Sequence, residues 1–369
     1  MKFIKASTFG ILAGGILTGA LVTMGLAGHA DAQFYKGKRV NVIINYSAGG
    51  NTDIQGRSVL RHMKKHVPGE PRFLVRNISG AGGIVGVNFL GEVAKRDGYT
   101  IGIFTIPIMA QIMRAPELRV DLRKLQMVGA IAQQTISHVR KDIIPGGIQK
   151  WTDFTKITKT IRTAGHGPQS SKDIRLRMFM EALNIPYEHV TGYKSAGKIR
   201  TAIMKNEIQL TADSMTGYFA RVVPNLVTPG ISVPLWHIGL PTADGKDLKC
   251  HPALKQFPCF IEAYEHKFGK GARPKGMPFK AMVVIAGTRS LLRIIVFPDG
   301  APKASLETMR AAWVKTMSDE GYLAEFRKQN GSELDGLTGA GAQKTLQSVA
   351  TVDPAVQKWL LDYANKGRK

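Results

Sequence analysis

Two stretches decide the fold, and each runs from an apolar strand through a glycine-rich turn into a helix: Val42-Ile43-Ile44-Asn45-Tyr46-Ser47-Ala48-Gly49-Gly50-Asn51-Thr52-Asp53 and Phe73-Leu74-Val75-Arg76-Asn77-Ile78-Ser79-Gly80-Ala81-Gly82-Gly83. Glycine has no Cβ, so backbone N–H groups in such turns can approach a ligand closely. The first N–H groups of the following helix lack partners, and the helix dipole favours negative charge there. Two such turns at one cleft would bind a carboxylate or phosphate without a charged side chain. The pattern therefore predicts an anion-binding cleft.

Strand and helix alternate around these turns, which favours a mostly parallel sheet with right-handed crossovers. We expect strands at 39–46, 73–77 and 99–105, and helices at 52–67 and 82–95. The apolar stretch 125–137 then crosses to a second unit of the same design, although no sequence repeat is visible. Its expected strands are 160–164, 187–191 and 208–212, with helices between them.

The chain is longer than a usual single-core domain, so we expect two lobes. Lobe 1 is expected at 33–133 with a C-terminal return at about 280–369, and lobe 2 at 134–279 with an insertion at about 242–278. The expected elements of the return are strands at 281–286 and 293–297 and helices at 302–317, 321–329 and 354–364.

The first 32 residues have the pattern of an export signal. Lys2 and Lys5 precede an uncharged stretch, and Ala30-Asp31-Ala32 supplies a small-x-small cleavage site before Gln33. The uncharged stretch is also long enough to span a bilayer, so an uncleaved anchor is the alternative. We expect cleavage and a periplasmic location.

The formal net charge of +24 would fall by one on removal of the signal, which contains Lys2, Lys5 and Asp31. Such an excess attracts anions towards clefts. Lys and Arg are scattered along the chain, without a long basic tail or an RNA-recognition signature, so we expect no nucleic-acid partner. We interpret most of the excess as a generally basic surface.

Cys250 and Cys259 are the only cysteines in the chain. Outside the cytoplasm an even pair usually forms a disulfide, which we expect here. A zinc site would recruit His251 and either His237 or His266, but the C-x-x-C spacing is missing. We expect neither a metal nor a cofactor.

The turns, in this order, resemble those of the Bug receptors of tripartite tricarboxylate transporters, a family of periplasmic solute-binding proteins. Residues 45–53 stand where the family usually reads P-F-x-P-G-G-x-x-D, and residues 77–83 match N-x-x-G-A-G-G. Asp97-Gly98-Tyr99-Thr100 matches a D-G-Y-T element. The match is looser in the second lobe, where residues 167–171 stand for G-x-x-S-S and residues 193–195 for Y-K-G. This chain departs from the family at Asn45 and Ala48, which replace prolines, at Ser195, which replaces a glycine, and in the atypical cysteine-bearing segment.

The resemblance implies a type II-like periplasmic-binding-protein fold, with two α/β lobes that close on a small di- or tricarboxylate. It implies transfer of that ligand to membrane permease subunits by a receptor that we expect to be a monomer. The first wall of the cleft would lie at the two glycine turns, and the opposite wall in lobe 2. The expected ligand-binding residues are Ser47, Gly49, Gly50, Asn51, Thr52, Asp53, Gly80, Ala81, Gly82, Gly83, Thr105, Ser170, Ser171, Tyr193 and Asp213.

Simpler interpretations stay open for several of these residues. Asp53 is either a ligand-site residue or a first-turn acid that suits the helix dipole. Asn51 or Thr52 is expected as an N-cap, and Thr52 could also donate to a ligand. Ser170 and Ser171 are expected to cap a helix first. Lys194 either reaches a distal carboxylate or is a solvated loop residue.

Catalytic patterns are weak in this chain. It has no H-E-x-x-H, no G-x-S-x-G and no cysteine outside the expected disulfide. His166, between two glycines, is the one tempting base, and it has no carboxylate partner nearby in sequence. Residues 80–86 fit the dinucleotide-binding spacing poorly. We therefore expect a receptor and not an enzyme, and keep an exported hydrolase acting on an anionic substrate as the alternative.

Overall fold

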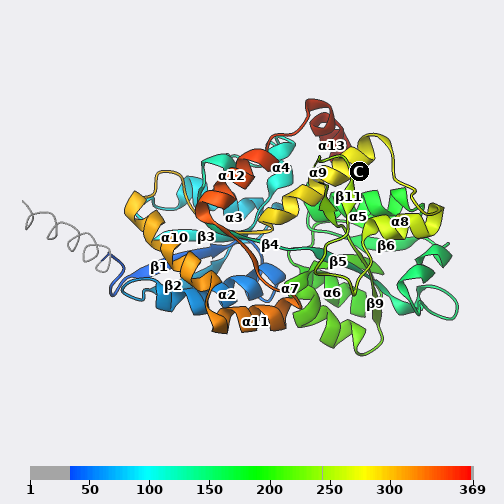
Figure 1. The fold of residues 1–369 in the computed structure, drawn as a ribbon, viewed down its shortest axis with the longest axis horizontal. Helices are drawn as coiled ribbons and strands as arrows, with labels where there is room; N and C mark the ends of the chain where they lie inside the picture. Colours follow the sequence, from blue (N-terminus) through cyan, green and yellow to red (C-terminus); the bar gives the residue numbers. More distant parts are fainter. Residues whose placement is uncertain (1–33, 243, 367–369) are drawn as a thin grey trace, which may run out of the picture.

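The computed structural model describes residues 34–242 and 244–366, so the expected export signal lies outside the described residues. These residues form two α/β lobes, each built on its own sheet (Figure 1). We call the part around the six-stranded sheet lobe 1 and the part around the five-stranded sheet lobe 2. The expected two-lobed α/β architecture is thus confirmed.

The sheet of lobe 1 has the strand order β13-β4-β12-β3-β1-β2. Its strands are β1 (Arg39–Ile44), β2 (Arg72–Asn77), β3 (Thr100–Thr105), β4 (Gln126–Ala132), β12 (Arg293–Phe297) and β13 (Asp335–Thr338). β1 pairs in parallel with both β2 and β3, whereas β12, β4 and β13 join antiparallel. The carboxyl ends of β1 and β2, where the two glycine turns begin, therefore lie at the same edge of the sheet.

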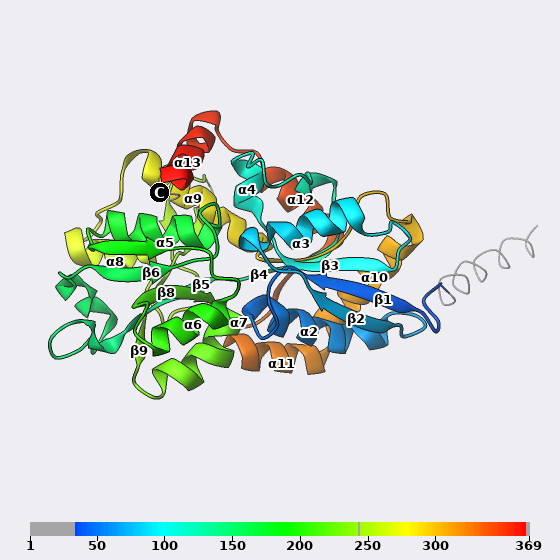
Figure 2. The same ribbon diagram turned by 180° about the vertical axis from the view of Figure 1, so that it is seen from behind.

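Helices cover both faces of this sheet (Figures 1 and 2). The helices are α2 (Asn51–Met63), α3 (Ile84–Asn88), α4 (Ile108–Ile112), α10 (Lys303–Met317), α11 (Glu320–Asn330) and α12 (Gly339–Val349). Neighbouring strand residues serve opposite faces: Ile44 packs with the helices α2, α10 and α11, and Ile43 with the core on the other face. Burial of both faces explains why the central strands β3 and β12 read as nearly continuous apolar runs.

Lobe 2 repeats the design with the strand order β7-β6-β8-β5-β9. Its strands are β5 (Thr135–Arg140), β6 (Ile161–Ala164), β7 (Tyr187–Val190), β8 (Leu210–Ser214) and β9 (Ser232–His237). In each lobe the first strand of the parallel unit lies between the second and the third strands. An antiparallel strand lies on the other side of the third. The expected crossing at 125–137 is confirmed, because β4 belongs to the first sheet and β5 to the second.

The helices around lobe 2 include α5 (Ser171–Ala182), which begins at the turn formed by residues 167–171. The others are α6 (Ala196–Met204), α7 (Met215–Gly217), α8 (Phe260–Phe268), α9 (Gly276–Gly287) and α13 (Pro354–Lys366). α13 packs on α9, and Arg177 of α5 donates a hydrogen bond of 3.0 Å to the Tyr363 carbonyl of α13. The last helix of the chain therefore lies against lobe 2, whereas the sequence led us to expect it on lobe 1.

One expected element of the return to lobe 1 has a different type in the structure. The strand expected at 281–286 is wrong, because these residues belong to helix α9. Ala281, Met282, Val283, Ile285 and Ala286 are all buried, so the helix is apolar on most sides. A short run that is buried all round has no period that separates a helix from a strand. The strand expected at 293–297 is confirmed as β12.

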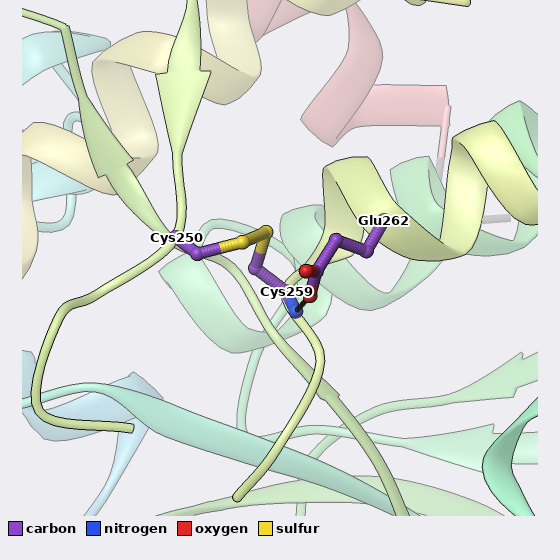
Figure 3. Close-up of side chains that lie close together, drawn as sticks. All are labelled: Cys250, Cys259 and Glu262. Atoms are coloured by element: carbon purple, nitrogen blue, oxygen red, sulfur yellow. Dashed lines mark hydrogen bonds between the residues drawn. A yellow bond between two sulfur atoms is a disulfide. The ribbon is translucent and has the colours of Figure 1, made fainter. Parts of the chain in front are cut away.

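The segment 242–278 begins after β10 (Leu240–Pro241) and contains β11 (Leu248–Lys249), which pairs with β10 in a small two-stranded ribbon. Cys250 and Cys259 form the expected disulfide within it (Figure 3). Glu262 accepts a hydrogen bond of 2.9 Å from the Cys259 backbone N–H at the start of α8. The two sulfur atoms are bonded to each other, so this group of residues does not offer the thiolates that a zinc site would need.

None of the helices in residues 34–242 and 244–366 combines the length and the apolar character of a bilayer-spanning helix.

Candidate functional site

A cavity of about 620 Å³ lies between the two lobes, lined by residues from the two glycine turns, α2, the end of β3, α4, the start of α5 and the start of β12. Eight of the residues expected to bind a ligand line it: Gly50, Asn51, Thr52, Ala81, Gly82, Thr105, Ser170 and Ser171. Seven others are not among its lining residues: Ser47, Gly49, Asp53, Gly80, Gly83, Tyr193 and Asp213. The structure thus brings both glycine turns and the lobe 2 serines to one cavity, and ligand binding by these residues stays a prediction.

The two glycine turns are fastened to each other by side chains. The Tyr46 hydroxyl donates to the Gly82 carbonyl at 2.7 Å, and the Ser47 hydroxyl donates to that of Ser79 at 3.2 Å. Asn77 donates to the Tyr46 carbonyl at 2.7 Å. Ser47 therefore joins the turns from behind the cavity.

Asn45 directly follows β1 and connects this strand to the second glycine turn and to the end of β3. Its amide nitrogen donates to the carbonyls of Gly83 at 3.1 Å and Thr105 at 2.9 Å, and its amide oxygen accepts from the Thr105 N–H at 3.1 Å. Gly83 has a φ of 97°, and a Cβ there would lie 2.5 Å from the Asn45 nitrogen. Asn45 replaces a family proline, and its amide bonds to both later elements fix the second turn and Thr105 beside the first turn.

Asp53 braces the first turn. Its carboxylate accepts from the Gly49 N–H at 3.0 Å, from Asn77 at 3.0 Å and from Arg57 at 2.9 Å. These bonds use both carboxylate oxygens inside lobe 1. The arrangement accords with the simpler interpretation of Asp53 as a first-turn acid.

The expected N-cap of α2 at Asn51 or Thr52 is wrong, because the cap position is Gly50, which has no side chain to offer. The first N–H groups of α2 therefore have no side-chain cap, and Gly50, Asn51 and Thr52 all line the cavity. The two side chains have other partners. The Thr52 hydroxyl lies 2.7 Å from that of Thr105, and Asn51 reaches across to lobe 2.

Asp213, at the end of β8, is the centre of a buried network between the lobes. It accepts from Asn51 at 2.7 Å, from Arg200 at 2.7 Å and from His138 at 3.2 Å. Burial alone would raise the pKa of Asp213, but the neighbouring Arg200 and His138 hold it far below its usual range. Gly217 makes room for this contact, because a Cβ there would lie 2.1 Å from the Asn51 amide. Asp213 thus holds the lobes together beside the cavity.

The start of α5 forms the lobe 2 wall, and the expected cap is confirmed: the Ser170 hydroxyl accepts from the Asp173 N–H at 3.2 Å. Asp173 is fully buried, and it accepts from His189 at 2.9 Å and Thr191 at 2.6 Å. Burial raises the pKa of Asp173, and these hydrogen bonds outweigh burial and lower it. Tyr193 packs against the core beside α6, and its carbonyl accepts from His166 at 2.9 Å.

Four cationic side chains at the cavity were missed by the sequence analysis: Lys172, Arg175, Arg289 and Arg293. The three arginines are each less than 5% exposed. Arg289 donates to the Ser171 hydroxyl at 2.9 Å, and Arg293 donates to that of Thr105 at 2.7 Å. By contrast, the Lys172 ammonium and the Nε and Nη1 of Arg175 are buried without a hydrogen-bond partner.

Burial lowers the pKa of each of these cations, because a low-dielectric site disfavours the charged form. The pKa of Lys172 falls to about 8, that of Arg293 to about 9 and that of Arg289 to about 10. Burial and the neighbouring charge of Arg289 lower the pKa of Arg175 well below its ordinary value. The lining of the cavity therefore carries positive charge that the protein compensates only in part.

His166 also lines the cavity and stays neutral at pH 7. Burial, followed by the charge of Lys172, lowers its pKa to about 4. Its Nδ1 donates to the Tyr193 carbonyl, so Nε2 of the neutral ring is an acceptor. The ring lies edge-on to Tyr46, with 5.1 Å between the centroids. The rest of the wall is apolar and includes Ile84, Met109, Ala110 and Leu292.

Comparisons with known proteins bear on this geometry. No family model matches the chain. The chain is 28% identical over 117 residues to the protein BugT of Bordetella pertussis, a match that covers 30% of this chain and 35% of BugT. The chain spans about a third or less of the length of the curated relatives that it matches.

Two solved structures share the fold over nearly their whole length. The periplasmic binding protein BugD matches with a TM-score of 0.63 and 19% identity, over 90% of this chain and 97% of BugD. A Rhodopseudomonas palustris protein solved with adipate matches with a TM-score of 0.66 and 15% identity, over 89% of this chain and 97% of that protein. The resemblance to the Bug family is confirmed. The two lobes have the periplasmic-binding-protein fold.

The Bug-like pattern of this chain helps to explain which site residues were missed. The family motifs cover the two glycine turns and residues 167–171, and only these parts of the cavity could be located from the motifs. Arg175 and Arg293 lie outside the motifs, each between apolar neighbours: Ile174 and Leu176, and Leu292 and Ile294. A cation inside an apolar run is the local signal that would have identified them, because such a residue is seldom buried without a role.

Proposed function

We propose that this protein is an extracytoplasmic solute-binding receptor that captures a small di- or tricarboxylate between its lobes and delivers it to membrane permease subunits of a tripartite tricarboxylate transporter. One observation carries the proposal. One cavity is lined from both lobes. Lobe 1 contributes two helix starts that are uncapped or rich in glycine, and lobe 2 contributes buried cations with nitrogens that lack a hydrogen-bond partner. Helix starts and cations both favour negative charge, so the cavity suits an anion with more than one acidic group.

The fold provides a way to couple capture to closure. Ligand contacts to both lobes favour the closed arrangement over an open one, which is population shift between two states. In the structure the lobes already touch at the cavity, where a Cβ on Gly82 would lie 3.5 Å from the Ser170 Cβ. A periplasmic location, a monomeric state and the permease partner belong to the same proposal.

The alternative of an exported hydrolase would need a nucleophile at the cavity; the Thr163 hydroxyl lies 2.8 Å from His189, but Thr163 is fully buried and is not among the residues that line the cavity. The Ser170 hydroxyl donates to Asp173, and the nearby His189 is bonded to the other oxygen of that carboxylate. His166 faces the cavity with its Nδ1 bonded to a backbone carbonyl. Incubation of the purified protein with candidate acids, with product analysis, would expose an enzyme if one were present.

The proposed function is tested by isothermal titration calorimetry with succinate and its monoamide, succinamate, at fixed salt and pH 7. A charge-assisted hydrogen bond contributes about 1.5–3 kcal/mol, so the monoamide should bind at least about tenfold more weakly. A thermal-shift screen of mono-, di- and tricarboxylates finds the best ligand first, because a ligand at about 100 times its Kd stabilises by about 2.7 kcal/mol. Equal affinity for acid and amide would mean that the cavity recognises shape and not carboxylate charge.

A further inference from the structure

The charges around the cavity specify more than a carboxylate. Four lining side chains are cationic, namely Lys172, Arg175, Arg289 and Arg293, and one is acidic, Glu117. His166 is neutral at pH 7. The lining therefore has an excess of three positive charges. Arg293 lies with Thr105 at the end of β3, and the other three cations gather around the first turn of α5.

The three cations at α5 occupy an unfavourable place for positive charge. The N-cap is Ser170, so Lys172 is the second residue of the helix and Arg175 lies one turn further on. Arg289 bonds to Ser171, the first residue of the helix. The N-terminal end of a helix carries partial positive charge, which disfavours cations there. Lys172 is therefore placed against the local electrostatics of its own helix.

Within the described protein, the carboxylates of Asp173 and Asp213 compensate Lys172 and Arg175 only in part, because the pKa of each cation stays below its ordinary value. The Lys172 ammonium and two nitrogens of Arg175 are buried without a partner, and so is the Nε of Arg289. Arg175 is 1% exposed, so water does not compensate it from outside. Asp173, the nearest acid in the helix, is already occupied by bonds from His189, Thr191 and the backbone of its turn. A buried cation without a partner is costly, and an anionic ligand is the compensation that the cavity allows.

Resting on the proposed function, we propose that the ligand carries one carboxylate at the glycine turns and, at its other end, an acidic group with two negative charges, bound by Lys172, Arg175 and Arg289. A ligand of this kind has three negative charges, which equals the excess in the lining. The doubly charged end is either a phosphate or phosphonate or a pair of neighbouring carboxylates. Both sources offer at least three acceptor oxygens to the unpaired donors of the cluster.

The test compares three ligands by calorimetry at pH 7 and constant ionic strength: succinate, with one charge at each end, tricarballylate, with neighbouring carboxylates, and 3-phosphoglycerate, with a phosphate. At least one of the two doubly charged ligands should bind about tenfold or more tighter than succinate, and the tighter of the two identifies the source. Succinate binding as tightly as both would overturn the inference and leave the proposed function standing. If the protein bound none of the three ligands, nor any other carboxylate in the screen, both the inference and the proposed function would be refuted.

Arg175→Gln is the decisive variant, and Arg177→Gln is its matched control. Both arginines are in α5 and at most 6% exposed, but Arg177 stacks on Tyr363, bonds to its carbonyl and does not line the cavity. R175Q should reduce the preference over succinate to threefold or less, whereas R177Q should keep it. A preference that survives in R175Q contradicts the proposal.

A second readout guards against a folding defect. Without ligand, R175Q should melt at or above the temperature of the unaltered protein, because the substitution removes repulsion between Arg175 and Arg289. If R175Q does not fold, Lys172→Gln replaces it, since the Lys172 stem is partly exposed and its loss leaves no cavity in the core. K172Q should also weaken the doubly charged ligand more than succinate. Equal weakening of both ligands in K172Q would overturn the proposal.

Discussion

Gly82→Val is expected to prevent tight ligand binding by holding the two lobes apart. Gly82 has a φ of 65°, and a Cβ there would point at lobe 2, 3.5 Å from the Ser170 Cβ. That distance is an ordinary contact, but each γ carbon of valine extends about 1.5 Å beyond the Cβ. A γ carbon would then approach Ser170 to about 2–2.5 Å, well inside the optimum of about 3.5–4.0 Å. The lobes would have to separate by about 1 Å or more.

The consequence for affinity follows from what Ser170 carries. It caps α5, so a displacement of Ser170 also moves Lys172 and Arg175 away from the glycine turns. Loss of one charge-assisted hydrogen bond costs about 1.5–3 kcal/mol, so affinity should fall by roughly 10- to 150-fold. The assay is calorimetry with the best ligand of the carboxylate screen, together with the melting temperature of the ligand-free variant.

Gly37→Val is the matched control for backbone strain. Gly37 has a φ of 69°, nearly that of Gly82, and a Cβ there would meet nothing within 4 Å. Both variants place valine in the left-handed region, which costs about 1–2 kcal/mol of stability. Only Gly82→Val should lose affinity. If the two variants bind the ligand equally well, then the contact between Gly82 and Ser170 does not govern closure and the reasoning fails.

Two further predictions concern protonation and the disulfide. With the pKa of Lys172 at about 8 in the empty cavity, its charge is present below pH 8 and is lost above it, so affinity for a dicarboxylate should be steady from pH 6 to 7.5 and fall between pH 8 and 9.5. Calorimetry in two buffers of different ionisation enthalpy should show proton uptake on binding near pH 8, and an affinity at pH 9.5 equal to that at pH 7 would contradict this. Replacing Cys250 and Cys259 together by serine should cost about 2–3 kcal/mol of stability by the loop-entropy argument, seen as a lower melting temperature. Ligand affinity should stay the same, because neither cysteine lines the cavity, and a changed Kd would show that the segment 242–278 acts on the site.

Much of lobe 1 was predictable because its signals are local. The apolar strands β1 and β2 each end in glycines, and a helix follows each turn, so strand, turn and helix all lie within a short window. Parallel pairing of the two strands then places both turns at one edge of the sheet. For these reasons Gly50, Thr52, Ala81 and Gly82 could be expected near one another from the sequence.

The cationic wall was not predictable in the same way. Arg289 and Arg293 come from the return of the chain to lobe 1, more than 100 residues after Arg175, and only the packed structure brings them to the cavity. The net charge of +24 gave no help, because a burial pattern is needed to separate a few enclosed cations from many surface ones. We interpreted most of the excess as surface charge, and the sequence alone offered no means to separate the few cations that are enclosed at the cavity.

A residue that departs from the family motif also shows what the sequence alone cannot predict. Asn45 stands where a proline is usual, and sequence alone could only mark it as a difference. In the structure its side-chain amide makes three hydrogen bonds to backbone groups, none of which a proline at this position could make. A substitution in a motif can therefore strengthen the turn that the motif builds.

The placement of Lys172 and Arg175 also bears on why such a site persists. An unpaired buried cation near a helix N-terminus destabilises the ligand-free protein, and this disadvantage is removed only when an anion enters. A protein selected for stability alone would place apolar or neutral residues at these two positions. The cost in the empty state increases the difference in free energy between the liganded and the empty protein, because the ligand relieves repulsion as well as forming hydrogen bonds. The cations that make the empty cavity unfavourable are thus the same groups that make an anion bind tightly.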